Sequence, residues 1–428
     1  MRSLAKKSTV SRHFTFYILH STFTLVSSLI KMDLRSLPEQ LSSFQRINQR
    51  RTLIERELKI DLKNTAPVES VVGESEKKNC EQMFGVVPVP VGYAGPLKVT
   101  FSNNQLSEIH LPLATTEGAL VASVNRGCKA ASVSGVTITK SIDHGMTRSI
   151  AFTPGNQSAS LDAIVQLLRG NEGKWKAVAE ATSNHLKILS YDIDIQKKYV
   201  FLTIACDTSE AMGMNMTTIA AQAIADWVTG SNPGIACPTI AGNVDSDKKP
   251  SRRTHDRGRG MEVTASTILS AETITDVLKS TPEAMLATAD AKLKAGSTLA
   301  GAIGANLHVA NIIAALYLAT GQDAAHVVEG SLADTTVSGS STTLRASLPS
   351  SLEISVRLPA ILVGVRGGGT ALPAQNQCLN LLLKNRGGLS LKKQLAESIA
   401  AAVLAGEVSV LAAQASHDLA KAHKNLAR

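Results

Sequence analysis

One stretch of unusual composition, residues 296 to 321, constrains the fold of this chain most strongly. Its sequence, GSTLAGAIGANLHVANIIAALYLATG, is dense in glycine and alanine. Side chains this small let a helix approach its neighbours closely, and Gly321 is placed to end the helix. The stretch therefore predicts a buried central helix.

The length of the chain predicts more than one domain. A chain of 428 residues exceeds what one hydrophobic core usually serves, and 44% hydrophobic residues are ample for two cores. Residues 149 to 240 have the pattern of an inserted module, with helices at 161–169, 174–188 and 217–229 and a strand at 199–205. Helices alternating with strands at this length predict a small α+β unit.

Three further segments have distinct patterns. Residues 38 to 62 predict an amphipathic packing or subunit-contact helix, with Leu53, Ile54, Leu58 and Ile60 on one face. Residues 85 to 97, GVVPVPVGYAGPL, interleave proline and glycine with valine, which favours an extended, rigid segment over a regular central strand. The sequence from 395 to the C-terminus predicts a helix that is first apolar and then charged.

Charge and cysteine content restrict the class of protein. The formal charge of +9 suits nucleic acid, an anionic membrane or a polyphosphorylated small molecule, but aromatic residues make up only 4%, which argues against a base-stacking surface. The five cysteines have no CxxC spacing, so the sequence indicates neither a disulfide framework nor a zinc site, and a reducing compartment fits best. The chain also lacks GxGxxG after a strand and lacks GxxxxGK[ST], which excludes a Rossmann fingerprint and a P-loop.

The first 31 residues allow three interpretations. They contain no acid, several basic and hydroxylated residues, and an apolar stretch that is too polar and too short for a clear membrane span. They are typical of an organellar transit peptide or, less well, of a secretory signal. Alternatively, translation starts at Met32 and the leader is an artefact. The protein would be cytoplasmic in that case and mitochondrial or otherwise organellar if the leader is real.

Single residues of interest have structural interpretations when each is taken alone. Glu117 lies in LATTEGALVASVNRGCKAAS, where Thr115 or Thr116 can cap a helix and Glu117 can complement its exposed N–H groups. The segment 247 to 260, DKKPSRRTHDRGRG, is typical of a solvated loop or a phosphate-binding patch. His423 lies near the frayed C-terminus, where a histidine is usually solvent-exposed.

Seven motifs considered together resemble the 3-hydroxy-3-methylglutaryl-CoA reductase family in their order and approximate spacing. They are TTEG at 115–118, MTR at 146–148, EAMGMNM at 210–216, DKKP at 247–250, GQDAA at 321–325, GGGT at 367–370 and the terminal His423. The resemblance covers about residues 70 to 425 and is strongest to the class found in eukaryotes and archaea, as a catalytic portion without membrane spans.

The resemblance implies an α+β fold with an internal insertion. Residues 85–148 and 241–428 would form a large mixed helix and sheet domain that binds substrate around a central buried helix. Residues 149–240 would form an inserted small ferredoxin-like α+β domain that binds NADP(H). Residues 32–84 would be an N-terminal helical region, and residues 1–31 a leader or artefact.

The resemblance also implies a reaction. 3-Hydroxy-3-methylglutaryl-CoA would be reduced to mevalonate and CoA with two NADPH, for isoprenoid and sterol synthesis by the mevalonate pathway. Lys248 matches the lysine that stabilises the oxyanion, and Glu117 the acid, which burial must keep protonated. Asp323 matches the aspartate that bridges lysine and glutamate, and His423 the histidine that protonates the departing CoA thiolate.

Binding residues and partners follow from the same resemblance. Around the hydroxymethylglutaryl group, where arginine and lysine pair with its carboxylate, the matching residues are Arg148, Asn243, Asp247, Lys249, Lys292 and Asn311. Around the coenzyme they are Ser183, Asn184, Glu210, Met212, Gly213, Met214, Asn215, Met216, Gly367 and Gly368. No metal and no nucleic acid are implied, and a homodimer or dimer of dimers is expected because the family assembles its active site across a dimer interface.

Four residues depart from the family pattern. Asn184 stands where an arginine contacts the 2′-phosphate of NADPH, so NADH is not excluded unless His185 or Lys187 compensates. Glu210 replaces an aspartate, Ala241 a serine and Arg366 a small apolar residue. Glu210 and Arg366 fall beside the nicotinamide pocket, where a displacement of about an ångström can cost on the order of a hundredfold in rate.

The alternative to a reductase is a catalytically impaired relative that only binds CoA. The presence of Glu117, Lys248, Asp323 and His423 argues against it, since drift would be expected to strike these residues too. Nucleic-acid binding through the basic loop is a further alternative, and it would require a continuous positive face.

Overall fold

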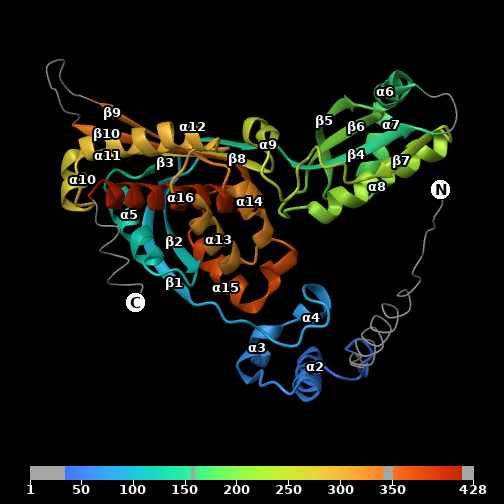
Figure 1. Cartoon of the computed structure of the whole chain (residues 1–428), viewed down its shortest axis with the longest axis horizontal. Coiled ribbons are helices and arrows are strands. Elements are labelled where there is room, and N and C mark those ends of the chain that lie inside the picture. The colour runs from blue at the N-terminus through green and yellow to red at the C-terminus, as the bar shows by residue number, and fades with distance from the viewer. Residues whose placement is uncertain (1–33, 156–159, 341–349, 417–428) are drawn as a thin grey trace, which may run out of the picture. The chain divides into compact units, whose positions relative to one another are not determined.

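The computed structural model describes residues 34–155, 160–340 and 350–416 (Figure 1). The chain divides into two compact units, one up to Pro88 and one from Val89 onward. The leader expected at residues 1–31 and the candidate His423 lie outside the described residues.

In the first unit, the predicted amphipathic helix forms as α2, Ser43–Leu58. Ser42 begins it with a capping box, and Ile47 packs into a small hydrophobic cluster. Leu58 and Ile60 remain exposed in this unit, so the prediction of a helix is confirmed but its expected apolar face is only partly buried. Three short helical segments follow: η1 (Lys63–Thr65), α3 (Glu69–Val72) and α4 (Ser75–Lys78).

The second unit contains a mixed six-stranded sheet in the order β2-β1-β3-β8-β10-β9. Its strands are β1 (Val91–Thr100), β2 (Leu106–Ala114), β3 (Val136–Asp143), β8 (Met261–Ser270), β9 (Asp334–Ser340) and β10 (Ser351–Ile361). Because β1 pairs with both β2 and β3, the prediction that this segment avoids a central strand is wrong from Val91 onward. The strand is nevertheless irregular, with a register shift between Ala94 and Leu97, because Pro96 has no N–H to donate.

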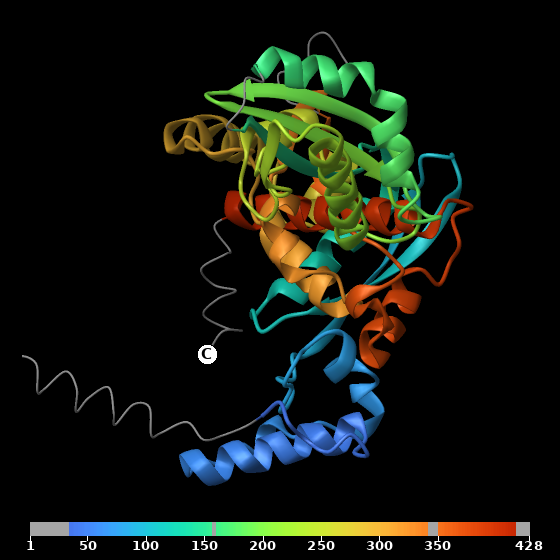
Figure 2. The same ribbon diagram turned by 90° about the vertical axis from the view of Figure 1, so that its right-hand side faces the viewer.

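Two long helices pack against each other and against the large sheet. They are α5 (Leu120–Ser134) and α16 (Leu391–Ala415), seen in Figures 1 and 2. Helix α16 is the one helix among the described residues that is long and apolar enough to cross a membrane, and its apolar window is entirely buried inside the protein. Burial on this scale makes α16 a core element of the unit.

The predicted central helix is shorter than expected. Helix α13, Val309–Thr320, is buried and ends at Gly321 with φ 71°, as predicted. Residues 296–308 instead finish a π-helix (Asp290–Gly296), form the short α12 (Ser297–Ala300) and then run irregularly through Gly301 and Gly304. Both glycines have positive φ, a conformation that ends a helix.

The remaining helices in the part of the chain that contains the large sheet are short. They are α9 (Arg252–Arg257), α10 (Ala271–Asp276), α11 (Pro282–Ala289), η3 (Ala324–His326), α14 (Val327–Gly330), η4 (Gly368–Ala371) and α15 (Pro373–Leu382). Helix α9 lies in the predicted basic loop, and its Arg253 and Arg257 pair with Asp192 at 2.8 and 3.0 Å. These arginines are therefore neutralised locally, which weakens the argument for a nucleic-acid surface.

A second, antiparallel sheet has the strand order β5-β6-β4-β7. Its strands are β4 (Met146–Pro154), β5 (Lys187–Gln196), β6 (Tyr199–Asp207) and β7 (Ile235–Thr239), and its helices are α6 (Leu161–Gly170), α7 (Glu172–Glu180) and α8 (Met214–Ser231). The chain order β4-α6/α7-β5-β6-α8-β7 with this pairing is the ferredoxin-like arrangement. A separate hydrophobic cluster serves this sheet, so the α+β fold class is confirmed, while the domain boundaries at 149 and 240 stay predictions.

One helix of this sheet was extended too far by the sequence pattern. The helix expected over 174–188 ends at Glu180, and the chain enters β5 at Lys187. The sequence KILSYDIDIQ places isoleucine and tyrosine in a segment that pairs with β6 along its whole length, and such residues favour a pleated strand.

Candidate active site

A cavity of about 540 Å³ opens where four predicted motifs, EAMGMNM, DKKP, GQDAA and GGGT, meet. The EAMGMNM loop before and within α8, the GGGT turn and the residues just after α13 form its walls. Nine of the predicted site residues line it: Lys248, Asp323, Met212, Gly213, Met214, Asn215, Met216, Gly367 and Gly368. The structure therefore brings the predicted lysine and aspartate to the same cavity as most of the predicted coenzyme residues.

Glycines allow the walls of this cavity to pack backbone against backbone. A Cβ atom on Gly364 would lie 2.3 Å from the Met212 nitrogen, and one on Gly321 would lie 2.3 Å from the Gly369 oxygen. A parallel bridge between Ala211 and Arg366 joins the two loops. The GGGT turn and the EAMGMNM segment at 210–216, called the methionine loop below, therefore pack at distances that larger residues would not permit.

Lys248 and Asp323 form an ion pair on the cavity wall. Lys248 Nζ lies 2.7 Å from Asp323 Oδ2, and the Lys248 backbone, with φ 58°, donates its N–H to Glu329 Oε1 at 2.5 Å. Partial burial raises the pKa of Asp323, but hydrogen bonds from Lys248 and Ala325 and the nearby charges bring it below the ordinary value. The lysine is therefore held by an ionised carboxylate, as an electrophilic ammonium requires.

Arg259 anchors the DKKP turn from inside the protein, and sequence reasoning missed it. Only 1% exposed, it donates from Nη2 to Asp247 Oδ1 at 3.0 Å and from Nη1 to Glu329 Oε1 at 2.9 Å. Its Nε also donates to Thr147 Oγ1 on β4 at 2.9 Å. The sequence signal was present in DRGRG, but a basic loop gave no reason to expect one of its arginines to be buried.

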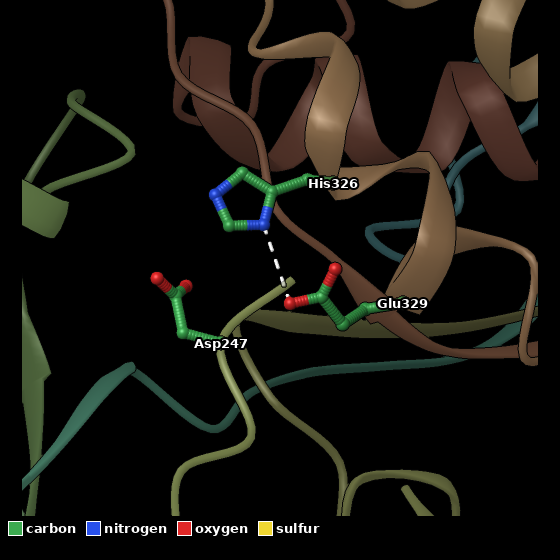
Figure 3. A group of neighbouring side chains, drawn as sticks. All are labelled: Asp247, His326 and Glu329. Carbon is green, nitrogen blue, oxygen red and sulfur yellow. Dashed lines mark hydrogen bonds and ion pairs between the residues drawn. The ribbon is translucent and has the colours of Figure 1, made fainter. Parts of the chain in front are cut away.

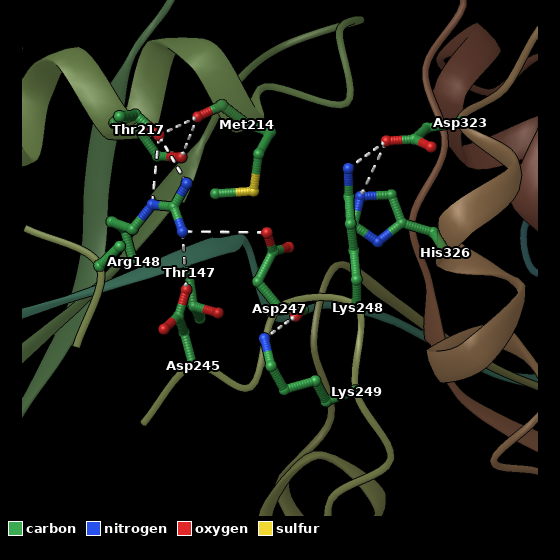
Figure 4. A network of polar contacts seen from close by, with 12 residues as sticks. Thr147, Arg148, Met214, Thr217, Asp245, Asp247, Lys248, Lys249, Asp323 and His326 are labelled. Atoms are coloured by element: carbon green, nitrogen blue, oxygen red, sulfur yellow. Dashed lines mark hydrogen bonds and ion pairs between the residues drawn. The ribbon is translucent and has the colours of Figure 1, made fainter. Parts of the chain in front are cut away.

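Arg148 lies on β4 beside the same turn (Figure 4). Its Nη1 is 3.4 Å from Asp245 Oδ2 and 3.9 Å from Asp247 Oδ2, while Nε and Nη2 donate to Thr218 Oγ1. Burial raises the pKa of Asp245 despite Arg259 and Arg148, whereas for Asp247 the two arginines and His326 outweigh burial and lower the pKa. The guanidinium of Arg148, the predicted substrate ligand, is therefore bound by protein groups in this structure.

Three of the other predicted substrate ligands lie on the surface. Lys249 Nζ donates to the Asp247 carbonyl at 2.9 Å. Asn243 is exposed with φ 67°, and Lys292, in the π-helix, donates to Gln414 Oε1 at 3.2 Å. The lysine of the π-helix is therefore near the end of α16, away from the DKKP turn in sequence.

Glu117 does not cap a helix. Helix α5 begins at Leu120 after Ala119, which has φ 71°, and Thr115 Oγ1 instead accepts the N–H of Glu117 within the turn. The Glu117 side chain is exposed and accepts a hydrogen bond from Asn311 Nδ2 at 3.0 Å. The capping interpretation is wrong, and the burial expected to keep this acid protonated is not provided within one chain.

The lysine and glutamate are also not brought together within one chain. Asn311 lies in the first turn of α13 and Asp323 follows its last turn, so the helical residues from Asn311 to Thr320 alone separate the two by about 14 Å along the helix axis. Among the described residues, Glu117 has no polar contact with Lys248 or Asp323. The predicted cluster of one lysine with two carboxylates therefore appears here as two separate pairs.

The predicted coenzyme residues outside the cavity have other partners. Ser183 Oγ donates to Met216 Sδ at 3.6 Å, which places the turn between α7 and β5 beside the methionine loop, and Asn184 is exposed. Lys187, considered as a compensating cation, is paired with Glu180 at 2.9 Å.

Glu210 has a structural role. Its carboxylate accepts the backbone N–H groups of Leu391 and Lys392 at 3.2 and 2.7 Å, so it caps the first turn of α16. The extra methylene relative to aspartate is accommodated in this contact.

Asp247, His326 and Glu329 form a further group of possible ligands (Figure 3). One ligand-type atom of each lies within 4.8 Å of the others. The buried guanidinium of Arg259 already contacts two of the three, Asp247 and Glu329. We interpret the group as an ionic network with arginine as its cation, because a metal ion would have to displace that guanidinium.

Comparisons with known proteins agree with the arrangement of motifs. The family model of hydroxymethylglutaryl-coenzyme A reductase matches residues 46–428. The 3-hydroxy-3-methylglutaryl-coenzyme A reductase of Haloferax volcanii is 40% identical over 358 residues, covering 83% of this chain and 86% of its own length. That of Methanocaldococcus jannaschii is 38% identical over 386 residues, covering 89% and 92%.

Among solved structures, the class II 3-hydroxy-3-methylglutaryl-CoA reductase from Streptococcus pneumoniae, bound to NADPH in open conformations, has a similar fold. It superposes with a TM-score of 0.61 at 19% identity and covers 93% of this chain and 97% of its own. At that identity the likeness concerns the fold alone. The family model and the archaeal relatives decide the question: the chain belongs to the hydroxymethylglutaryl-coenzyme A reductase family.

Proposed function

We propose that this protein reduces 3-hydroxy-3-methylglutaryl-CoA to mevalonate and CoA with NADPH as the coenzyme. The observation that carries the proposal is the Lys248 ammonium, held by Asp323 on the wall of a cavity that the methionine loop and the GGGT turn also line. Family membership supports the reaction, and the intact lysine and aspartate count against an impaired relative that only binds CoA.

The residues of the cavity fit a dinucleotide. Gly367 and Gly368 have positive φ, and the space beside each Cα is open, so their backbone can be approached closely. The first turn of α8 carries neither an acidic residue nor a side-chain cap, which leaves N–H groups for phosphate oxygens. Two NADPH molecules, bound in turn, would each supply one of the two hydrides of the reaction.

Lys248 would act on the substrate oxygen. Negative charge develops on the thioester oxygen as the hemithioacetal forms and on the aldehyde oxygen in the second reduction, and a fixed ammonium stabilises both. Asp323 orients Lys248 through their ion pair, and the pKa of Asp323 itself is lowered in this contact although burial opposes the shift. His423 would protonate the CoA thiolate as the hemithioacetal collapses, and Glu117 would supply the proton to the second alkoxide.

We further propose that the site is completed by a second copy of this chain. The Lys248–Asp323 pair and the Glu117–Asn311 pair lie at opposite ends of α13, so one chain alone does not place both beside one substrate. A partner subunit that covers Glu117 would also provide the burial that raises a carboxyl pKa and keeps it protonated.

The coupled oxidation of NADPH, followed by absorbance with 3-hydroxy-3-methylglutaryl-CoA and the full chain, tests the proposed reaction. We expect substrate-dependent oxidation that falls by on the order of a hundredfold or more in Lys248→Ala, because one oxyanion-stabilising donor is lost. A parallel run with NADH measures what Asn184 permits.

Lys279→Ala is the matched control, because Lys279 is exposed and has φ 57°, close to the 58° of Lys248. Both substitutions place alanine at a left-handed backbone position, but only Lys248→Ala removes the lysine of the cavity. No oxidation of either coenzyme by a folded wild-type protein would overturn the reductase and favour the CoA-binding relative.

A further inference from the structure

His326 is a buried titratable residue that has no assigned role in the proposed reaction. It ends η3, three residues after Asp323, and its side chain is completely buried. Its Nδ1 lies 3.4 Å from Glu329 Oε1 (Figure 3), and its Nε2 lies 3.8 Å from Asp323 Oδ2 (Figure 4). Among the described residues, Nε2 has no hydrogen-bond partner, which is costly for a buried polar atom.

The neighbours of His326 determine which of its nitrogens carries hydrogen. Glu329 Oε1 already accepts the Lys248 N–H and the Arg259 guanidinium, so the Nδ1 that faces this acceptor oxygen is placed to donate to it. Nε2 faces a second carboxylate, that of Asp323, so both ring nitrogens lie beside acceptor oxygens. The charged and titratable groups around the ring are Asp323, Glu329, Asp247, Lys248, Arg259 and, within reach of the Glu329 charge, Tyr317.

We propose that His326 is a positioning residue for Lys248: anchored to Glu329 through Nδ1, it holds the Asp323 carboxylate, which in turn holds the catalytic ammonium. The inference rests on the proposed reductase function. The same Glu329 carboxylate also accepts the backbone N–H of Lys248. The buried pair of His326 and Glu329 would therefore position the backbone of Lys248 directly and its side chain through Asp323.

The electrostatics of Asp323 support this role. Burial raises the pKa of Asp323, and the opposing contributions include a positive charge on His326 as well as the contacts with Lys248 and Ala325. Removing the imidazole should therefore raise the pKa of Asp323 and let it protonate at higher pH. A protonated Asp323 no longer pairs with the ammonium, so Lys248 would lose its orientation.

Two substitutions separate positioning from packing. Glutamine in His326→Gln keeps an N–H donor for Asp323 but no charge, whereas leucine in His326→Leu keeps only volume. At neutral pH we expect kcat to fall on the order of ten- to a hundredfold in His326→Leu, because a displaced reacting group is costly, and to be largely rescued in His326→Gln. The KM for 3-hydroxy-3-methylglutaryl-CoA should stay within about twofold, since His326 does not line the cavity.

The pH profile of kcat provides the readout that a purely structural role would not move. We expect the acid limb to shift to higher pH in both variants, because both lack the charge that helps keep Asp323 ionised. His255→Gln is the matched control, since His255 also lies between two carboxylates, 2.9 Å from Asp256 and 2.8 Å from Asp334, outside this cavity. It should leave the acid limb in place.

Each outcome bears on the proposal. If His326→Gln folds, as judged by thermal unfolding, and keeps the wild-type acid limb, or if His326→Leu keeps wild-type kcat, the positioning role is wrong. Should His326→Leu fail to fold, the acid limb of His326→Gln still decides. An active wild type with unaffected variants removes this role alone, whereas an inactive wild type removes the reductase function itself.

Discussion

At the scale of single residues, the position of Lys248 depends on a side chain that never reaches the cavity. Arg259 is buried among acidic groups and fixes both Asp247, the neighbour of Lys248, and Glu329, which binds the Lys248 N–H. The lysine adopts φ 58°, a backbone conformation that is rare for residues with a side chain and that such a network can sustain.

Arg259→Met should lower the free energy of unfolding by about 3–5 kcal/mol, because removing the arginine leaves the buried carboxylates without a compensating charge. The arginine lowers the pKa of Asp247 against the effect of burial, so its contribution is present above the unfolded-state value and is lost as pH falls. Urea unfolding should therefore reveal a difference from wild type that shrinks toward acid pH. Arg257→Met, whose ion pair with Asp192 is exposed, should change stability by no more than about 1 kcal/mol; a similar loss in both variants would contradict this account.

At the scale of elements, helices α5 and α16 approach each other closely because Gly127 has no side chain at their contact. A Cβ atom on Gly127 of α5 would lie 1.8 Å from the Ala405 carbonyl oxygen of α16. Helix α16 in turn starts beneath the Glu210 carboxylate, so its position connects the core to the methionine loop.

Gly127→Ala should destabilise the protein by about 1–3 kcal/mol, because the two backbones must move apart. Gly230→Ala, in α8, has open space around its Cα and should be neutral or stabilising by up to about 1 kcal/mol. The midpoints of urea unfolding for the two variants measure the contrast. Equal stability of both would mean that the α5–α16 contact is looser than described.

The elements also mark how far sequence patterns reach. Periodicity and caps predicted α6, α8 and the end of α13 at Gly321, because these signals are local. The central position of β1 and the strand β5 were missed, since pairing partners far along the chain decide them. In the site, the resemblance of the motifs to a known family predicted nine residues that line the cavity, whereas Arg259, His326 and Glu329 carry no local sequence signal of burial.

At the scale of the whole molecule, the separation of the two polar pairs is the observation on which the proposed second chain rests. Helix α13 spans the distance between Asn311 with Glu117 and Asp323 with Lys248, and it is a buried core helix that cannot bend to unite them. A two-fold dimer related by self-complementary surfaces would form two composite sites, each taking one pair from each chain.

Mixing two inactive variants tests this arrangement. In a heterodimer of Glu117→Gln and Lys248→Ala chains, one composite site carries both substitutions and the other carries neither. After dissociation and random reassociation of equal amounts, half of the dimers are mixed, so we expect about a quarter of the wild-type rate of NADPH oxidation. Each variant alone, treated identically, provides the baseline. If the mixture is no more active than that baseline while cross-linking or light scattering demonstrates mixed dimers, then Glu117 and Lys248 act within one chain, and a rearrangement of the DKKP turn, not a partner subunit, must bring them together.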